Sequence, residues 1–192
     1  MKKQIYKNTL LIIAVVLLIL SLLLGIGMAL TMNAQSAGEL KQFVNAGLTD
    51  NTIGFKQMLF SSAKRNLIFT AFAFVGSFNI WLFAIFVLAY MFQGFSVGFS
   101  VMFTLKNFSA GISAAVIASS LLYILLLFPI YIIFFCISYK YAVSKGRTNS
   151  FVSPEKPKML FKRLIIFVAV YIFALITSIP EALINPLILK LL

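Results

Sequence analysis

The chain has almost none of the side chains on which enzyme chemistry usually depends. Its 192 residues include no histidine, one cysteine and four acidic residues. General acid–base catalysis, metal ligation and nucleophile activation need such residues in groups. We therefore expect no catalytic residue, no metal site and no cofactor, and we expect the protein not to be an enzyme. The acidic residues are Glu39, Asp50, Glu155 and Glu181.

The single cysteine gives no indication of a disulfide. Cys136 lies deep in an apolar run, and the chain contains no second cysteine with which it could pair. We interpret Cys136 as a small buried apolar side chain. It therefore says nothing about the redox compartment of the protein.

Charged residues are also scarce, whereas apolar residues dominate. Hydrophobic residues make up 62% of the chain and charged residues 10%. A soluble domain of this size does not need so many apolar side chains. The net charge of +12 lies mainly at the ends of apolar runs, which argues against nucleic-acid binding. The predicted fold is an all-α integral membrane protein, a polytopic bundle of about five transmembrane helices.

The first third of the chain is predicted to contain one span and one polar excursion. Residues 1–8 form a basic N-terminus, and residues 9–32 form an apolar run too long for a cleaved signal peptide, so we expect an uncleaved anchor. Residues 33–66 are expected to form an external amphipathic segment. Its apolar stripe could pack on the bundle, lie among lipid headgroups or dock a partner.

The uncharged stretch 67–105 is too long for one crossing. It predicts either two short transmembrane helices or one span plus a re-entrant half helix. A break at Gly76-Ser77-Phe78-Asn79 fits the half helix, whereas a turn near 83–86 would divide the stretch evenly. The sequence leaves both alternatives open.

The last third predicts two more spans, at 110–139 and 164–189, the second with a broken outer end at its prolines. Between them, residues 140–163 carry seven cations and one acid, Glu155. Basic loops stay on the cytoplasmic side of a membrane. We therefore expect a plasma membrane protein with a cytoplasmic N-terminus and basic loop, and an external C-terminus.

Small residues and one proline predict how the helices pack. Gly94 and Gly98 stand four residues apart on one helix face, a spacing that lets two backbones approach closely. Pro129 removes a backbone donor inside its span and predicts a kink. A second small-residue face is predicted at Gly111, Ala115 and Ser119.

Three segments carry a family resemblance. They are Lys64-Arg65-Asn66-Leu67, the stretch from Gln93 through Val101, and Glu181-Ala182-Leu183-Ile184-Asn185-Pro186-Leu187. With their spacing, the N-terminal anchor and the basic last loop, the chain resembles the stage II sporulation protein M family. The resemblance implies a scaffold of the plasma membrane that breaks no bonds itself. In spore formers such a scaffold recruits cell-wall hydrolases, the stage II sporulation proteins P and D, to the septal membrane during engulfment.

Two further expectations concern partners. Glu181 and Asn185 are candidate contacts for an external partner, with a merely solvated carboxylate as the alternative for Glu181. A different class of function also stays open, a permease or export subunit working with an ATPase, in which polar residues would line a path. The expected surroundings are membrane lipid and no nucleic acid, and a homo-oligomer is left open.

Overall fold

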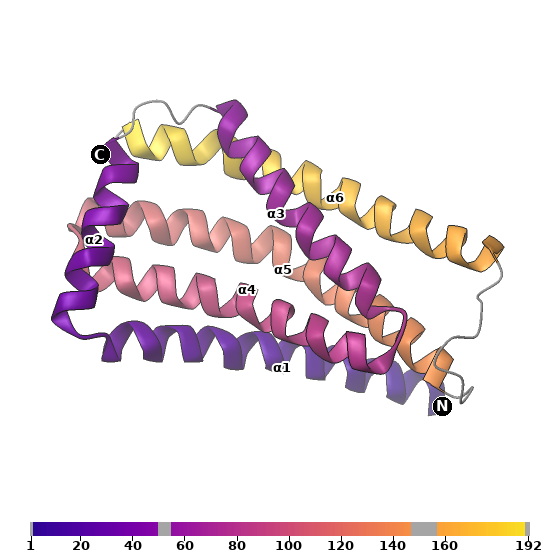
Figure 1. Ribbon diagram of the computed structural model, residues 1–192. Helices are drawn as coiled ribbons and strands as arrows, with labels where there is room; N and C mark the ends of the chain where they lie inside the picture. The colour runs from indigo at the N-terminus through magenta and orange to yellow at the C-terminus, as the bar shows by residue number, and fades with distance from the viewer. Residues whose placement is uncertain (1, 50–54, 147–156, 191–192) are drawn as a thin grey trace.

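The protein is a bundle of long helices (Figure 1). A computed structural model describes residues 2–49, 55–146 and 157–190; within these ranges, the side chains of residues 2–7, 45–49 and 180–190 and of a few single positions are not described. The described ranges hold six helices and no strand. The helices are α1 (Lys2–Thr31), α2 (Ala34–Thr49), α3 (Phe55–Gly76), α4 (Ile80–Asn107), α5 (Ala110–Gly146) and α6 (Pro157–Lys190).

The helices form two layers with α2 across one end. Figure 1 shows α1, α4 and α5 side by side, α3 and α6 against them, and α2 crossing the end at which α1 and α4 finish. Helices α1, α4 and α6 run in one direction, and α3 and α5 run in the other. The most extensive contact joins α1 and α4, which are parallel to each other.

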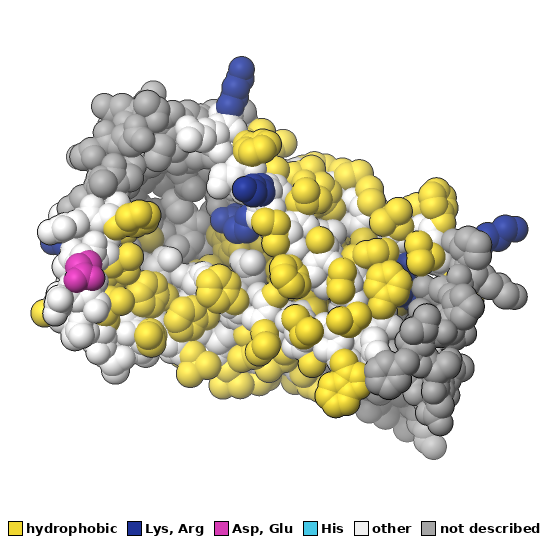
Figure 2. All heavy atoms as spheres, viewed as in Figure 1, with side chains coloured by type: hydrophobic (Ala, Val, Ile, Leu, Met, Phe, Trp, Pro, Cys, Tyr) yellow, Lys and Arg dark blue, Asp and Glu magenta, His cyan; other side chains and the backbone are white. Residues whose placement is uncertain are grey.

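Four helices in the described ranges are long and apolar enough to cross a membrane. They cover Asn8–Thr31, Ile80–Asn107, Ala110–Ser144 and Lys158–Ile179. Large apolar side chains cover much of the visible outer surface (Figure 2), as expected for a surface that faces acyl chains. These findings confirm the predicted all-α membrane bundle.

The region around 67–105 shows which predicted break the chain adopts. Helix α3 ends at Gly76, and α4 begins at Ile80 after Asn79, whose side chain accepts a hydrogen bond from the Trp81 amide at 3.3 Å. The break therefore lies at residues 77–79 and not at 83–86, because Asn79 caps the new helix. Helix α4 is a full span, whereas α3 is the shorter arm of the hairpin and is not among the four candidate spans.

The segment 33–66, predicted to be one external segment, does not form a single element. It contains α2 and the first half of α3, because α3 begins at Phe55. The apolar stripe of α2 packs on the bundle: Ala37 is buried with Ala29 and Phe103, and Leu40 lies against this cluster. Among the three alternatives for this stripe, the structure thus favours packing on the bundle.

The boundaries of the basic loop 140–163 and of the two spans beside it also differ from the prediction. Helix α5 continues past Tyr139 to Gly146, and α6 begins at Pro157, a residue that suits the first turn of a helix. Several of the loop's cations therefore lie on helix ends. Helix α6 continues through Pro180 and Pro186 to Lys190, so the broken outer end expected within 164–189 is absent from its described backbone. Proline is tolerated in membrane helices where neighbouring groups satisfy the backbone groups that it frees.

Pro129 lies inside α5, and the helix continues beyond it. The kink predicted there stays a prediction. Cys136 on the same helix is half-buried and forms no disulfide bond within the described residues. The packing around this part of α5 is aromatic: Phe69, Phe83, Phe86, Tyr131, Phe134 and Phe135 are all buried in one cluster.

The parallel pair α1 and α4 is held at glycine contacts. A Cβ atom added to Gly94 would lie 2.9 Å from the Leu18 carbonyl oxygen, and one added to Gly98 would lie 3.0 Å from the Leu22 carbonyl carbon. On the facing helix, a Cβ at Gly25 would lie 2.8 Å from the Phe99 amide nitrogen. No side chain fits at these three positions, so the backbones touch directly.

We predict that Gly98→Ala lowers the thermal stability of the purified protein in detergent. The added methyl group would meet the backbone of Leu22, and overpacking of this kind costs about 1–3 kcal/mol. The matched control is Gly27→Ala on α1, because a Cβ there meets nothing within 4 Å. Equal melting temperatures for the two variants would show that the glycine contact does not hold α1 to α4.

The arrangement also predicts which ends of the helices share a side of the membrane. Ser36 and Ser109 are exposed at the α2 end, whereas Met159 is 66% exposed at the opposite end. In a Cys136→Ala background, cysteines at Ser36 and Ser109 should react with an impermeant thiol reagent added to intact cells. A cysteine at Met159 should react only after lysis, since the basic end is expected inside. The reverse pattern would overturn the predicted orientation.

Candidate functional site

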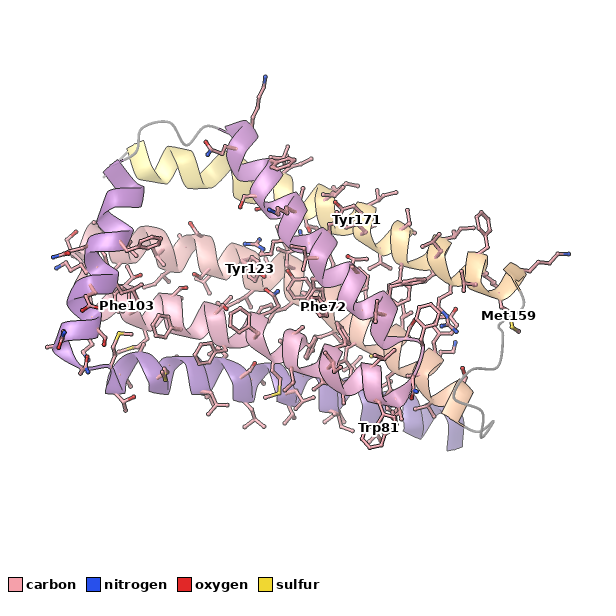
Figure 3. The ribbon with its side chains drawn as sticks, in the orientation of Figure 1. Phe72, Trp81, Phe103, Tyr123, Met159 and Tyr171 are labelled. Atoms are coloured by element: carbon pink, nitrogen blue, oxygen red, sulfur yellow. The ribbon has the colours of Figure 1, made fainter. Side chains whose placement is uncertain are left out.

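The polar residues of the bundle gather at its middle. Helix α3 carries Arg65 and Asn66 to the level of Gln93, which lies close to the midpoint of α4. Figure 3 shows Tyr123 between the α2 end, marked by Phe103, and the opposite end, marked by Trp81. The sequence had placed Arg65 at the membrane boundary. It lies inside the bundle because α3 begins well before it, at Phe55.

A chain of hydrogen bonds crosses four helices at this level. The Tyr123 hydroxyl donates to Gln93 Oε1 at 3.1 Å and lies 3.0 Å from the Tyr131 hydroxyl, which donates to Asn66 Oδ1 at 3.0 Å. Asn66 Nδ2 then donates to Ser178 Oγ at 2.8 Å. The Ser178 hydroxyl ends the chain on the Ala174 carbonyl at 2.8 Å. The chain thus joins α4, α5, α3 and α6.

The hydroxyl protons restrict the direction of this chain. If both tyrosines donate to amide oxygens, neither has a proton left for the 3.0 Å contact between them. In the contact between the two hydroxyls either oxygen can be the donor, and a tyrosine that donates there gives up its bond to an amide oxygen.

Asn66 is the branch point of the network. Its side chain is only 1% exposed, and it bonds to both α5 and α6. Its own backbone carbonyl accepts from the Thr70 hydroxyl at 2.7 Å. Since a buried amide left without partners costs about 1–3 kcal/mol, Asn66 fixes the position of α3 relative to both neighbours.

Arg65 sits beside the network. Its guanidinium carbon lies 4.9 Å from the centre of the Tyr123 ring, a cation–π geometry. The side chain is half-buried, and the neighbouring Lys64 is exposed. The two adjacent cations lie level with the middle of α4. On insertion scales, a charged side chain at the centre of a bilayer costs about 2.5–3.5 kcal/mol.

A groove lies between α3 and α4 next to these cations. Its volume is about 440 Å³, which is within the range of small-molecule sites. Its described lining contains two cations and no carboxylate. Figure 2 shows dark-blue side chains of α3 at the edge of a hollow in this face. The lining residues are Ser61, Lys64, Arg65, Ile68, Phe69, Phe72, Ala89, Phe92 and Gln93.

Another cation, Arg163 of α6, is buried at the C-terminal end of α3. Arg163 is 2% exposed and donates from Nη1 to the Ser77 carbonyl at 3.2 Å. Its guanidinium carbon lies 4.5 Å from the Tyr141 ring centre and 5.1 Å from that of Phe78. The positive charge sits where α3 ends with unsatisfied carbonyls, so Arg163 closes the turn between α3 and α4.

The predicted site residues have different surroundings. Gly94 and Gly98 lie against α1, as described above. Gly111 is exposed and Ser119 is half-buried, and the side chain of Ala115 is outside the described residues. The side chains of Glu181 and Asn185 are also outside the described residues, so their predicted partner contact stays a prediction.

The sequence analysis missed Arg65, Asn66, Tyr123 and Tyr131 as a group. The segment Lys64-Arg65-Asn66-Leu67 was noted as the opening of an apolar run. A signal was present, because the apolar residues of α3 begin before this segment, at Phe55 and Leu59. A helix that starts there carries both cations into the bundle.

No group of three or more histidine, cysteine, aspartate or glutamate residues that could hold a metal ion occurs in the searched part of the chain that the structure describes. The polar groups of the described site are cations, amides and hydroxyls. Such groups bind anions and hydrogen-bonding ligands.

We predict that Tyr131→Phe destabilises the bundle by about 1–3 kcal/mol, because it removes the hydroxyl that links Tyr123 to Asn66. The control is Tyr171→Phe, which removes a half-buried hydroxyl whose bond to the Ala63 carbonyl is long, at 3.4 Å. Thermal unfolding in detergent measures both. A Tyr131→Phe variant as stable as Tyr171→Phe would show that the network contributes no stability.

A scan against protein-family models, a search of curated proteins and a search of solved structures each found no match to this chain.

Proposed function

We propose that the protein is a non-enzymatic, multi-pass scaffold of the plasma membrane. In a sporulating host, it would recruit peptidoglycan hydrolases of the stage II sporulation protein P and D types to the septal membrane during engulfment. The family resemblance of three segments supports the process. The lack of histidine and the scarcity of acidic residues support a role in location and not in chemistry.

The observation that carries the proposal is the fixed position of α2. This amphipathic helix is held across one end of the bundle by Ala37 and by a cation–π contact between Lys41 and Phe108, at 5.6 Å from ammonium nitrogen to ring centre. Its outer face stays open: Phe43 is 77% exposed. A rigid platform on the membrane surface suits a scaffold, because it limits the ordering that a partner must induce on binding.

Charge supports the expected orientation of this platform. The exposed cations Lys140, Lys158 and Lys162 lie at the end of the bundle opposite α2. Basic residues next to spans favour the cytoplasmic side, so α2 would face outward, where the cell wall lies. Glu181 and Asn185 remain candidate contacts for an external partner.

The permease alternative is favoured by one observation. Lys64 and Arg65 lie at mid-depth beside Gln93, and ionisable residues within a membrane commonly mark a path for a charged substrate. An export subunit working with an ATPase would use them in that way. The two candidates differ in the partner that each requires.

We predict that deletion of the gene in a sporulating host stalls engulfment and removes fluorescently tagged hydrolase from the septum. The hydrolases should stay active when purified, because a scaffold supplies local concentration and not chemistry. Normal septal recruitment in the deletion strain would overturn the proposal. Co-purification of an ATPase in place of wall hydrolases would favour the permease.

Variants of the protein expressed in the deletion strain give a sharper test of α2 as the platform for a partner. Phe43→Ala should reduce hydrolase recruitment without loss of stability, because this side chain is largely exposed. The matched control is Phe173→Ala, a 65% exposed residue on the lipid-facing side of α6, which should leave recruitment unchanged. Glu181→Gln, which keeps the size and removes the charge, tests the predicted carboxylate contact.

A further inference from the structure

A stripe of polar residues on α3 leads from the α2 end of the bundle into the groove between α3 and α4. Gln57, Ser61 and Lys64 follow one another at spacings of four and three residues, so they share one helix face, and all three are exposed. Ser61 and Lys64 also line the groove. Because α3 begins at the α2 end (Figure 1), the stripe continues from that end to the level of the middle of α4.

Helix α4 carries a matching polar stripe. Gln93 lines the groove, and Ser96 and Ser100 follow it at spacings of three and four residues on the same helix face. Ser96 is half-buried and Ser100 is exposed. Helix α4 runs in the opposite direction to α3 and finishes at the α2 end (Figure 1), so both stripes lead from the groove to the same end of the bundle.

We propose that this groove is a water-filled vestibule, open to the aqueous phase at the α2 end and closed toward the basic end. Water and small hydrophilic solutes would reach the level of Gln93 and stop there. The inference is independent of the scaffold proposal, because it rests on the groove and the two polar stripes. It also holds for either orientation of the bundle in the membrane.

The exposure of Lys64 supports a filling of water. Arg65 lies over the Tyr123 ring, whereas Lys64 is exposed at the groove. Ionisable residues within membrane segments face the bundle interior or a water-filled cavity, and an ammonium group is strongly hydrated. A groove of about 440 Å³ has room for several water molecules. Ser61 and Gln93 supply the further hydrogen-bonding partners that ordered water needs.

The groove becomes apolar toward the basic end. Beyond Lys64, its lining on α3 continues with Ile68 and Phe72, and beyond Gln93 its lining on α4 continues with Ala89. The Phe69 and Phe86 rings, which are buried, lie 5.4 Å apart between centroids and fill the space between the two helices. Apolar surroundings offer water no hydrogen bonds, so the vestibule should end at this level.

The rates at which hydrophilic thiol reagents modify single cysteines test the proposal. The variants Ser61→Cys and Lys64→Cys are made in a Cys136→Ala background, in sealed membranes that present the α2 end to a charged methanethiosulfonate reagent. The matched control is Leu67→Cys, because Leu67 is on the same helix, 53% exposed, and not among the groove lining residues. The reactive thiolate forms in water and not among acyl chains, so both groove variants should react about tenfold or more faster than Leu67→Cys. Equal rates at Lys64→Cys and Leu67→Cys would overturn the proposal.

Three further measurements complete the test. Ser61→Cys should react faster than Leu67→Cys with an anionic and with a cationic reagent; a fast reaction with the anionic reagent alone would identify attraction by cations in place of hydration. Phe72→Cys, at the apolar end, should react as slowly as Leu67→Cys, and a fast reaction there would overturn the closed end. Lys64→Cys should be modified from the same side of the membrane as Ser36→Cys. Modification only from the side of Met159→Cys would overturn the assigned opening.

Discussion

The position of α3 depends on one constraint, that a polar group inside a membrane bundle must find its partners within the protein. Asn66 satisfies this constraint by bonding to Tyr131 on α5 and to Ser178 on α6. Helix α3 is too short in apolar length to be held by lipid alone. These bonds, with the aromatic contacts of Phe69, keep it against its neighbours. The hairpin with α4 and the groove between the two helices follow from that placement.

The other half of the bundle is held by a different means. Helices α1 and α4 carry few polar groups at their contact and approach through Gly25, Gly94 and Gly98. Between apolar helices in lipid, association depends on close packing, because lipid chains already solvate the side chains well. Two hydrogen bonds add to this contact: within the pair the Tyr90 hydroxyl donates to the Ala14 carbonyl at 2.9 Å, and at one end Lys106 donates to the Leu30 carbonyl at 3.0 Å.

The sequence was informative about the membrane bundle and less so about its interior. Apolar length identifies long spans directly, and Asn79 is a recognisable cap, so the bundle and the candidate break between α3 and α4 were predictable. The start of α3 was missed, because the polar residues that precede Leu67 resemble a loop when each is taken alone, although Phe55 and Leu59 stand before them. Their burial becomes visible only when partners far along the chain are known, such as Ser178 for Asn66. The continuity of α6 through Pro180 was missed for a related reason, since proline is also compatible with a helix in which other groups satisfy the freed carbonyl.

Arg65 and Arg163 both lie beside aromatic rings of the bundle. A stability argument alone would favour an apolar residue at mid-depth, because a cation there costs about 2.5–3.5 kcal/mol on insertion scales. The cation–π contact of Arg65 with Tyr123 returns about 0.5–2 kcal/mol of this cost. Arg163 is different, because it is enclosed at the end of α3 by Tyr141, Phe78 and the Ser77 carbonyl. Arg163 therefore has a structural explanation in the turn that it closes.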